Sequence, residues 1–197
     1  INSGLLSAAR ELPMTPECPN LKGILKSVSE GDCEAFARLY DLFYLRVYRF
    51  ARYFIRNRED REETVAEVFR IVWQNRHLLP GIRNFESYVY VVTRHEAFRI
   101  LRSYPRYRHI SIDEMPVEVT SAQPDAEAGL MEREMMRLYT EAVETLPERC
   151  KLIFLMVREQ RLRYREVAQI LAISEKTVER QVNIAIKKIL KIVRERF

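Results

Sequence analysis

The sequence has few cysteines and glycines and no long apolar run. Its three cysteines, Cys18, Cys33 and Cys150, lie far apart, form no Cys-x-x-Cys pair and have no histidine cluster to complete a metal site. This spacing argues against a disulfide framework and a zinc site, so we expect reduced thiols, with Cys33 and Cys150 buried in the core. No apolar run approaches the roughly 20 residues of a membrane helix, and no signal peptide is recognisable at the amino end. We therefore expect a cytoplasmic protein without direct membrane insertion.

Sequence signatures of catalysis are also missing. The chain has no glycine-rich phosphate loop, no metal-ligand spacing and no nucleophile elbow, and its histidines have no evident partners. We therefore expect no enzyme activity, no cofactor, no metal and no small-molecule substrate. The composition, with 47% hydrophobic and 31% charged residues and a net charge of +5, is typical of a globular protein. A charge of this size is compatible with nucleic-acid binding, although its distribution matters more than its total.

Helical periodicity dominates residues 31–103. Apolar residues recur at three- and four-residue spacing from Phe36 to Phe54, which places them on one stripe of a helix. The pattern breaks at Asn57, and a second apolar stripe follows in DREETVAEVFRIVWQNR, where Asp60 is the expected N-cap. A third stripe comes before residue 103, so the segment predicts a bundle of roughly four helices.

Three segments depart from this helical pattern. Residues 1–30 are predicted to be a flexible extension. Residues 79–87, LPGIRNFES, contain a proline and a glycine and predict a loop. Residues 104–129 have no sustained periodicity, and between His109 and Leu130 they carry five acids and no Lys or Arg. Because helices in a bundle are usually joined by about 2–8 residues, this last segment predicts a flexible acidic linker between two domains.

Residues 130–197 are helical again and contain a helix-turn-helix pattern. The stretch YREVAQILAISEKTVERQVNIAIKKIL, residues 164–190, has two apolar stripes around a tight turn, and Ser174 can cap the second helix. The polar side chains left outside suit a helix that enters a DNA major groove. An ordinary helical hairpin with a solvated charged face is the alternative, and Ala172 stands in the turn where this motif commonly has glycine. Together the patterns predict an all-α fold of two helical domains.

Two long stretches resemble the sigma-70 family of RNA polymerase sigma factors. LPERCKLIFLMVREQRLRYREVAQILAISEKTVERQVNIAIKKIL resembles region 4 of the family, and AFARLYDLFYLRVYRFARYFIRNREDREETVAEVFRIVWQNR, followed by FESYVYVVTRHEAFRILRS, resembles region 2. With only a linker between them, the chain resembles the extracytoplasmic-function (ECF) subfamily over residues 31–197. The resemblance implies a transcription initiation factor that binds core RNA polymerase and recognises and opens promoter DNA, the minus-ten element by region 2 and the minus-thirty-five element by region 4.

The resemblance assigns roles to three groups of side chains. Those expected to bind core polymerase are Glu62, Glu63, Thr64, Glu67 and Arg70. Opening the minus-ten element requires stacking surfaces and cations, and the side chains expected there are Arg83, Asn84, Phe85, Tyr88, Arg94, His95, Arg99 and Arg102. The side chains expected at the minus-thirty-five element are Arg163, Arg165, Lys176, Thr177, Arg180, Gln181, Asn183, Lys187 and Lys188, of which the last two are assigned to phosphates.

The resemblance also implies how partners act on the chain. It implies that the acidic linker threads through the polymerase active-site cleft and the RNA exit path, and that an anti-sigma factor holds the protein inactive. The alternative function is a stand-alone helix-turn-helix regulator whose first domain senses a ligand or dimerises. A sensor domain should show a ligand pocket or a phosphoacceptor pattern, and the sequence of residues 31–103 shows neither.

Overall fold

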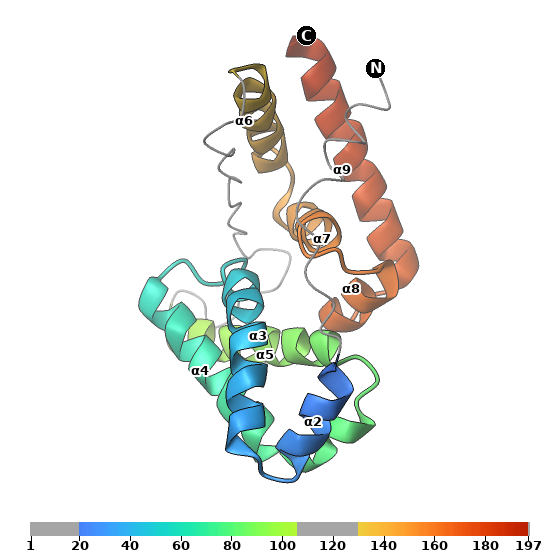
Figure 1. Ribbon diagram of the computed structural model, residues 1–197. Helices are drawn as coiled ribbons and strands as arrows, with labels where there is room; N and C mark the ends of the chain where they lie inside the picture. The colour runs from blue at the N-terminus through green and yellow to red at the C-terminus, as the bar shows by residue number, and fades with distance from the viewer. Residues whose placement is uncertain (1–19, 106–129, 197) are drawn as a thin grey trace.

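The computed structural model describes residues 20–105 and 130–196, with side chains from residue 134 onward in the second range (Figure 1). Helices are the regular elements of these two ranges, and no strand occurs in them, which confirms the predicted all-α fold. Most of the predicted extension and almost all of the predicted acidic linker lie outside the described residues. No helix within the described ranges combines the length and the apolar character required to cross a bilayer.

The first domain begins earlier than the sequence predicted. α2 falls within the range expected to be a flexible extension, yet it packs against α3 and η1 and buries Leu25 and Val28. The boundary expected at residue 31 is therefore too late. The elements of this domain are α2 (Leu21–Ser29), α3 (Cys33–Ala51), α4 (Arg58–Gln74), the 3-10 helix η1 (Arg76–Gly81) and α5 (Phe85–Ser103).

Side-chain caps fix where α3 and α4 begin. The Asp32 carboxylate accepts hydrogen bonds from the two amides at the start of α3, at 2.8 and 3.0 Å. At α4 the cap is Asn57, whose side-chain oxygen accepts a hydrogen bond from the Glu59 amide at 3.2 Å. The prediction of Asp60 as the cap was therefore wrong. Asn57 is also a residue type favoured at N-caps, so the helix begins one turn earlier and includes Asp60.

The loop predicted over residues 79–87 is shorter in the structure. Its first residues belong to η1, and Asn84 caps α5 by accepting a hydrogen bond from the Ser87 amide at 3.0 Å. Phe85, Glu86 and Ser87 consequently form the first turn of α5, which places their side chains by helical geometry.

Aromatic side chains join α3 to the other helices of the first domain. The ring centroids of Phe43 and Phe85 lie 4.9 Å apart, and those of Phe36 and Trp73 also lie 4.9 Å apart. The predicted stripe on α3 is thus confirmed as part of the core. Full burial of a large apolar side chain, as for Phe43 and Phe85, stabilises the fold by about 1.5–3 kcal/mol. The α3 stripe therefore fixes α4 and α5, which carry most of the candidate site residues of this domain.

The second domain is built around α7, whose residues 150–156 are all buried. α9 packs against α6, α7 and α8, so the long last helix runs along the whole domain (Figure 1). The elements of this domain are α6 (Leu130–Glu144), α7 (Glu148–Arg158), α8 (Tyr164–Leu171) and α9 (Glu175–Arg196).

The turn between α8 and α9 is built without glycine. Ala172 adopts the left-handed conformation with φ of 55°, and the Ile173 amide closes α8 by donating to the Ala168 carbonyl at 2.9 Å. The left-handed conformation costs a non-glycine residue about 1–2 kcal/mol. Ser174 caps α9 as predicted, with its Oγ accepting from the Thr177 amide at 3.0 Å. A tight helix-turn-helix therefore forms despite the strain at Ala172.

The two cysteines in the described ranges have different environments. Cys150 is buried as predicted, its thiol donates to the Gln181 carbonyl at 3.3 Å, and burial raises the pKa of the thiol. Cys33 is exposed at the first residue of α3, so the prediction that it belongs to the core was wrong. Because α3 buries the stripe that begins two residues later at Ala35, its first residue faces away from the core.

The two domains contact each other directly. α5 of the first domain packs against α8 of the second, and Figure 1 shows the short α8 lying above the first domain. Hydrogen bonds cross the interface from Tyr53, Asn84 and Tyr90 to the second domain. The described residues therefore form one body in which the beginning of α5 faces α8.

Candidate nucleic-acid interface

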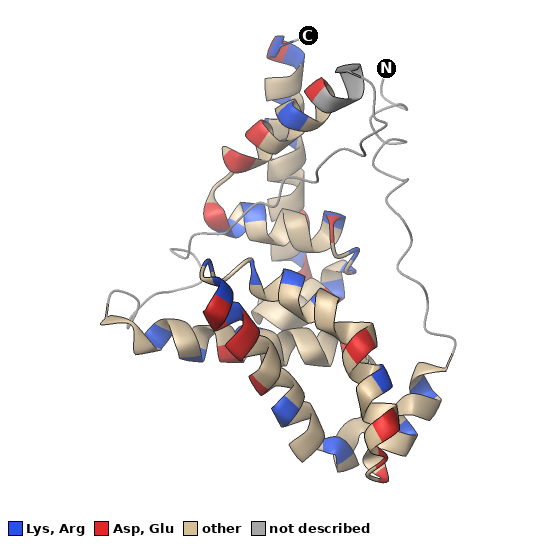
Figure 2. Cartoon of the chain, turned by 60° about the vertical axis from the view of Figure 1, so that its left-hand side comes forward, with Lys and Arg blue, Asp and Glu red and all other residues tan. Residues whose placement is uncertain are grey.

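The first turns of α4 present a charged face, and Figure 2 shows acids gathered there. Glu62 and Glu63 are exposed, and Glu62 accepts a hydrogen bond from Arg58 Nε at 2.8 Å. One turn further along, Arg70 Nε donates to Glu67 Oε2 at 2.7 Å, and this hydrogen bond lowers the pKa of the Glu67 carboxyl. The outward face of α4 therefore carries both acidic and basic side chains, and a protein partner with complementary charges can bind it.

Thr64 does not belong to that face. Its side chain is fully buried, and its hydroxyl donates to the carbonyl of Asp60 at 2.7 Å. The predicted role of Thr64 in polymerase binding is therefore corrected to a structural one. The other four predicted residues, Glu62, Glu63, Glu67 and Arg70, share the outward side of α4.

Arg99 connects the charged face of α4 to α5. Its Nε donates to Glu96 Oε2 at 2.6 Å, and its Nη2 lies 3.8 Å from Glu63 Oε1. These hydrogen bonds and charges raise the pKa of Arg99, with the Glu96 hydrogen bond the largest cause. A residue predicted to contact DNA therefore lies next to a residue predicted to contact polymerase, and no local pattern in the sequence predicts this proximity.

α5 carries a stripe of aromatic and basic side chains. His95, Arg99 and Arg102 are exposed and follow Tyr88 at spacings that keep all four on one side of the helix. Tyr88 is half-buried, which raises the pKa of its hydroxyl, and the Arg102 guanidinium lies 5.7 Å from the centroid of the Phe98 ring. An aromatic ring followed by cations is the combination that binds a single strand, with stacking on the ring and phosphates on the cations.

Arg94 and His95 interact with each other. Arg94 Nη2 lies 2.8 Å from His95 Nε2. Because a guanidinium only donates hydrogen bonds, Nε2 of His95 accepts and the ring proton resides on Nδ1. Burial, together with the charge of Arg94, lowers the pKa of His95. The imidazole is therefore neutral at pH 7 and can offer one N–H donor to a ligand.

The start of α5 is divided between core and surface. Arg83 and Asn84 are exposed just before the helix, whereas Phe85 is only 2% exposed, with its ring against Phe43. Phe85 cannot stack on a base in this arrangement, so its predicted role is corrected to packing. The Asn84 amide nitrogen donates to Glu166 Oε1 of α8 at 2.7 Å. Asn84 is therefore occupied by the second domain.

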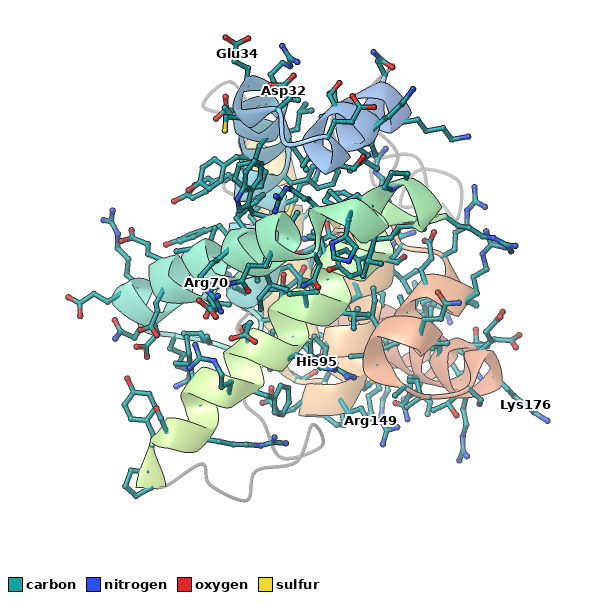
Figure 3. The ribbon with its side chains drawn as sticks, turned by 90° about the horizontal axis from the view of Figure 1, so that it is seen from below. Asp32, Glu34, Arg70, His95, Arg149 and Lys176 are labelled. Atoms are coloured by element: carbon teal, nitrogen blue, oxygen red, sulfur yellow. The ribbon has the colours of Figure 1, made fainter. Side chains whose placement is uncertain are left out.

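The exposed side of α9 carries a second polar stripe. Lys176, Arg180, Asn183 and Lys187 are exposed and recur at spacings of three and four residues, so they lie along one face. In Figure 3, Lys176 extends away from the body of the chain, on a different side from Arg70 and His95 of the first domain. This stripe matches a helix that lies in a major groove with its first turns toward the bases.

The remaining predicted residues of the second domain differ in accessibility. Lys188, Arg163 and Arg165 are exposed, whereas Thr177 and Gln181 are partly buried. Thr177 is also engaged in the turn, because its hydroxyl lies 2.8 Å from Ser174 Oγ. The exposed cations around α8 and α9 therefore form the accessible part of this candidate interface.

Comparison with known proteins places these two candidate surfaces in one family. Residues 39–107 match the model of Sigma-70 region 2, and residues 136–189 match the model of Sigma-70, region 4. The two matches together span more than half of the chain, in the order that the sequence predicted. The chain belongs to the sigma-70 family.

The chain is similar to a relative described as an ECF sigma factor and shares its fold with two solved structures. The chain is 31% identical over 119 residues to the ECF RNA polymerase sigma factor SigK of Mycolicibacterium vanbaalenii; the match covers 56% of this chain and 60% of SigK, less than two thirds of that relative. CnrH, solved in complex with the cytosolic domain of CnrY, superposes with a TM-score of 0.56 and 16% identity over 88% of this chain and 97% of CnrH. RpoE, solved with the anti-sigma factor NepR from Bartonella quintana, superposes with a TM-score of 0.58 and 14% identity over 81% of this chain and 96% of RpoE.

Sequence reasoning missed the residues between the two domains. Tyr53, Tyr90, Glu159, Gln160 and Glu166 were assigned no role, yet they form hydrogen bonds across the interface. Their partners lie far apart in the chain, and a single sequence carries no signal for such pairs. The polar residues at the α7–α8 turn predict only a turn.

Proposed function

We propose that the protein is a sigma factor that binds core RNA polymerase and directs it to specific promoters. The observation that carries this proposal is the presence, in one chain, of two sigma-70 domains that each expose a stripe suited to DNA. α5 offers an aromatic ring followed by cations, and α9 offers a polar stripe with lysines toward its middle. A regulator that only binds duplex DNA would use α9 and leave the stripe on α5 without a ligand.

Each surface then has its own partner. The outward face of α4, with Glu62, Glu63, Glu67 and Arg70, docks on core polymerase by charge complementarity. The stripe on α5 binds the unpaired minus-ten strand, and His95 supplies one neutral donor there. The stripe on α9 enters the major groove at the minus-thirty-five element, with Lys187 and Lys188 on phosphates.

The segment between the domains has an electrostatic role in this proposal. The sequence between His109 and Leu130 carries five acids and no Lys or Arg, so it can occupy a basic channel that polymerase uses for nucleic acid. Growing RNA would displace it. Cutting the chain in this segment while supplying both halves is expected to impair initiation.

An anti-sigma factor completes the set of proposed partners. The two solved relatives are described as complexes with the cytosolic domain of CnrY and with the anti-sigma factor NepR. We extend this mode of regulation to the present chain, because a partner of that kind can cover both the α4 face and the DNA stripes. The protein acts in the cytoplasm, where polymerase is, and contributes binding energy without a chemical step of its own.

The test is run-off transcription with bacterial core polymerase on a promoter pool selected by this protein. The decisive variant exchanges Glu67→Arg and Arg70→Glu, because it keeps the ion pair on α4 while inverting the charge pattern that polymerase meets. Template-specific transcripts from the wild type and their loss in this variant support the proposal. The matched control exchanges Lys191→Glu and Glu195→Lys, a pair 3.8 Å apart near the end of α9, and is expected to transcribe normally.

One result would favour the alternative function, and another would contradict only the docking role of α4. If the chain binds duplex DNA but neither binds core nor yields transcripts, with a known sigma factor active on the same core, the protein is a stand-alone regulator. If the exchange of Glu67 and Arg70 leaves core binding unchanged, α4 is not the docking helix.

A further inference from the structure

One acidic side chain interrupts the polar and basic stripe on the exposed side of α9. Glu179 is exposed and lies three residues after Lys176 and four before Asn183, so helical spacing places it on the same side as the stripe. Figure 3 shows Lys176 extending away from the body of the chain, where a ligand can reach this side of the helix. Glu179 therefore faces whatever the first turns of α9 bind.

The ends of the helix give no reason for an acid at this position. Ser174 caps α9 with its Oγ, and Glu175 is the acid of the first turn. A carboxylate interacts favourably with the helix dipole within that first turn, and the effect falls off beyond it. Glu179 belongs to the second turn, so the dipole does not account for it.

The Glu179 carboxylate is also unused inside the protein. In the part of the chain that the structure describes, Glu179 forms no hydrogen bond and no ion pair. Elsewhere on the same helix, Lys191 and Glu195 pair across one turn at 3.8 Å, whereas Lys176 does not pair with Glu179 in this way. The carboxylate oxygens of Glu179 therefore remain free to accept hydrogen bonds from a ligand.

A carboxylate that enters a DNA groove accepts few bases. The phosphates repel it and the groove removes its water, so its oxygens need donors on the DNA. In the major groove cytosine N4 and adenine N6 donate, whereas guanine and thymine present acceptors. Adenine also presents its N7 acceptor beside N6, and an ionised carboxylate has no donor for it. Cytosine, which presents the N4 donor and no acceptor of its own, is therefore the base that matches Glu179.

We propose that Glu179 is a specificity-determining residue of α9, whose carboxylate accepts a hydrogen bond from N4 of one cytosine in the minus-thirty-five element. The proposal rests on the proposed function for the placement of α9 in that groove. Glu179 acts mainly by penalising the other base pairs, because each of them leaves the carboxylate facing an acceptor. The guanidinium of Arg180, the next residue, suits the acceptors of guanine, so the two consecutive side chains read opposite features of the DNA.

The test is selection of duplexes from a random pool by the full chain, alone and bound to core polymerase. Anisotropy titrations then compare all four base pairs at each selected position. The wild type should prefer C·G at one position by about 5- to 150-fold, the ratio expected for one good base contact. Glu179→Ala should bind all four pairs there about equally. Glu179→Gln should shift the preference to A·T, because glutamine matches both N6 and N7 of adenine.

A control separates base reading from a change of net charge. Glu195→Gln removes the same charge from the last turn of α9 and should leave every base preference unchanged. Both Glu179 variants should bind scrambled duplexes more tightly than the wild type, because a negative charge facing the phosphates is lost. Circular dichroism confirms that each variant is folded.

The outcomes distinguish this proposal from the proposed function. If the folded Glu179 variants keep the base preferences of the wild type, Glu179 is a solvated surface charge and the proposal is overturned. A preference that changes at a pair other than C·G overturns the assignment to cytosine, and a pool without any selected sequence in either condition overturns base reading by α9. Loss of a C·G preference with Glu179 supports the proposal even where core binding and transcription fail, because the preference is measured on duplex binding.

Discussion

The Tyr104 hydroxyl lies within hydrogen-bonding distance of both carboxylate oxygens of Asp60, at 2.8 and 3.1 Å. Asp60 is in the first turn of α4, and Tyr104 directly follows the end of α5. The contact therefore ties the beginning of the proposed docking helix to the end of the proposed minus-ten helix. Arg99 of α5 also lies near Glu63 of α4. These two side-chain contacts help to hold α4 and α5 in their relative position.

Removing the Tyr104 hydroxyl should weaken this connection slightly. Tyr104 is 38% exposed, so solvent competes for the bond, and Tyr104→Phe is expected to lower the free energy of unfolding only slightly, by less than the loss of a buried hydrogen bond would. Urea denaturation followed by circular dichroism measures the loss. Tyr164→Phe, at 37% exposure, is the control for removing a surface hydroxyl. Equal effects of the two variants would show that the bond to Asp60 adds nothing.

Replacing the strained alanine of the helix-turn-helix should stabilise the second domain. Ala172→Gly removes the strain of the left-handed conformation, which costs alanine about 1–2 kcal/mol. Glycine also raises the conformational entropy of the unfolded chain, which lowers the free energy of unfolding by about 0.4–1 kcal/mol. The expected net gain in the free energy of unfolding is about 0.5–1 kcal/mol. Ala66→Gly, at an exposed position within α4, should instead cost about 1 kcal/mol. A loss of stability from both variants would contradict the conformation assigned to Ala172.

Two residues of α9 should differ in how they affect DNA binding. Lys187→Ala should weaken binding to all duplexes alike and reduce the slope of the logarithm of affinity against the logarithm of salt concentration by about 1. Arg180→Ala, one turn nearer the start of the helix than Asn183, should cost about 1–3 kcal/mol on the preferred sequence and relax the preference at one base pair. Titrations of selected and scrambled duplexes at several salt concentrations distinguish the uniform loss of affinity from the sequence-dependent one. A uniform loss from Arg180→Ala would reassign Arg180 to phosphate.

Closure of the two domains should depend on pH through Glu159. Burial raises the pKa of the Glu159 carboxyl above its ordinary value of 4.5, and the hydrogen bond from Tyr53 and the charges of Arg52 and Arg49 only partly oppose this. In the second domain, Tyr139 interacts electrostatically with Glu159 and with Arg158. The closed form therefore binds the Glu159 proton more tightly than an open form does. Closure is favoured at low pH and weakens as pH rises through the raised pKa.

This dependence can be measured as the radius of gyration of the folded chain against pH. The radius should increase as the pH rises above the ordinary carboxyl range, and Glu159→Gln should remove most of the change. A radius that falls with rising pH would contradict the burial of Glu159 in the interface.

Local signals were enough to predict much of the helical framework. The Phe36 to Phe54 stripe, the break at Asn57 and the cap at Ser174 all follow from spacing and capping preferences within a few residues. The errors are also local. Asp60 and Asn57 are both good caps, and the sequence alone did not decide between them. The structure shows that Asn84, another favoured cap, ends the loop three residues earlier than predicted from its proline and glycine.

The candidate sites were predicted less completely than the helices. The family resemblance identified the helices that carry them, but it did not distinguish exposed from buried side chains on one helix, as Thr64 and Phe85 show. The contacts of Tyr53 with Glu159 and of Asn84 with Glu166 depend on how two domains pack. No pattern in one segment predicts such a contact, because each partner is defined by the arrangement of the whole chain.

The contact between Phe36 and Trp73 has a practical consequence. Trp73 is the only tryptophan of the 197 residues, and it is flanked by the Phe36 ring and by the Arg76 guanidinium, 4.7 Å from its ring centroid. Its fluorescence emission therefore reports whether α3 and α4 are packed, and it has no counterpart in the second domain. Intrinsic fluorescence and circular dichroism, recorded in the same denaturation experiment, would show whether the second domain melts together with the first or by itself.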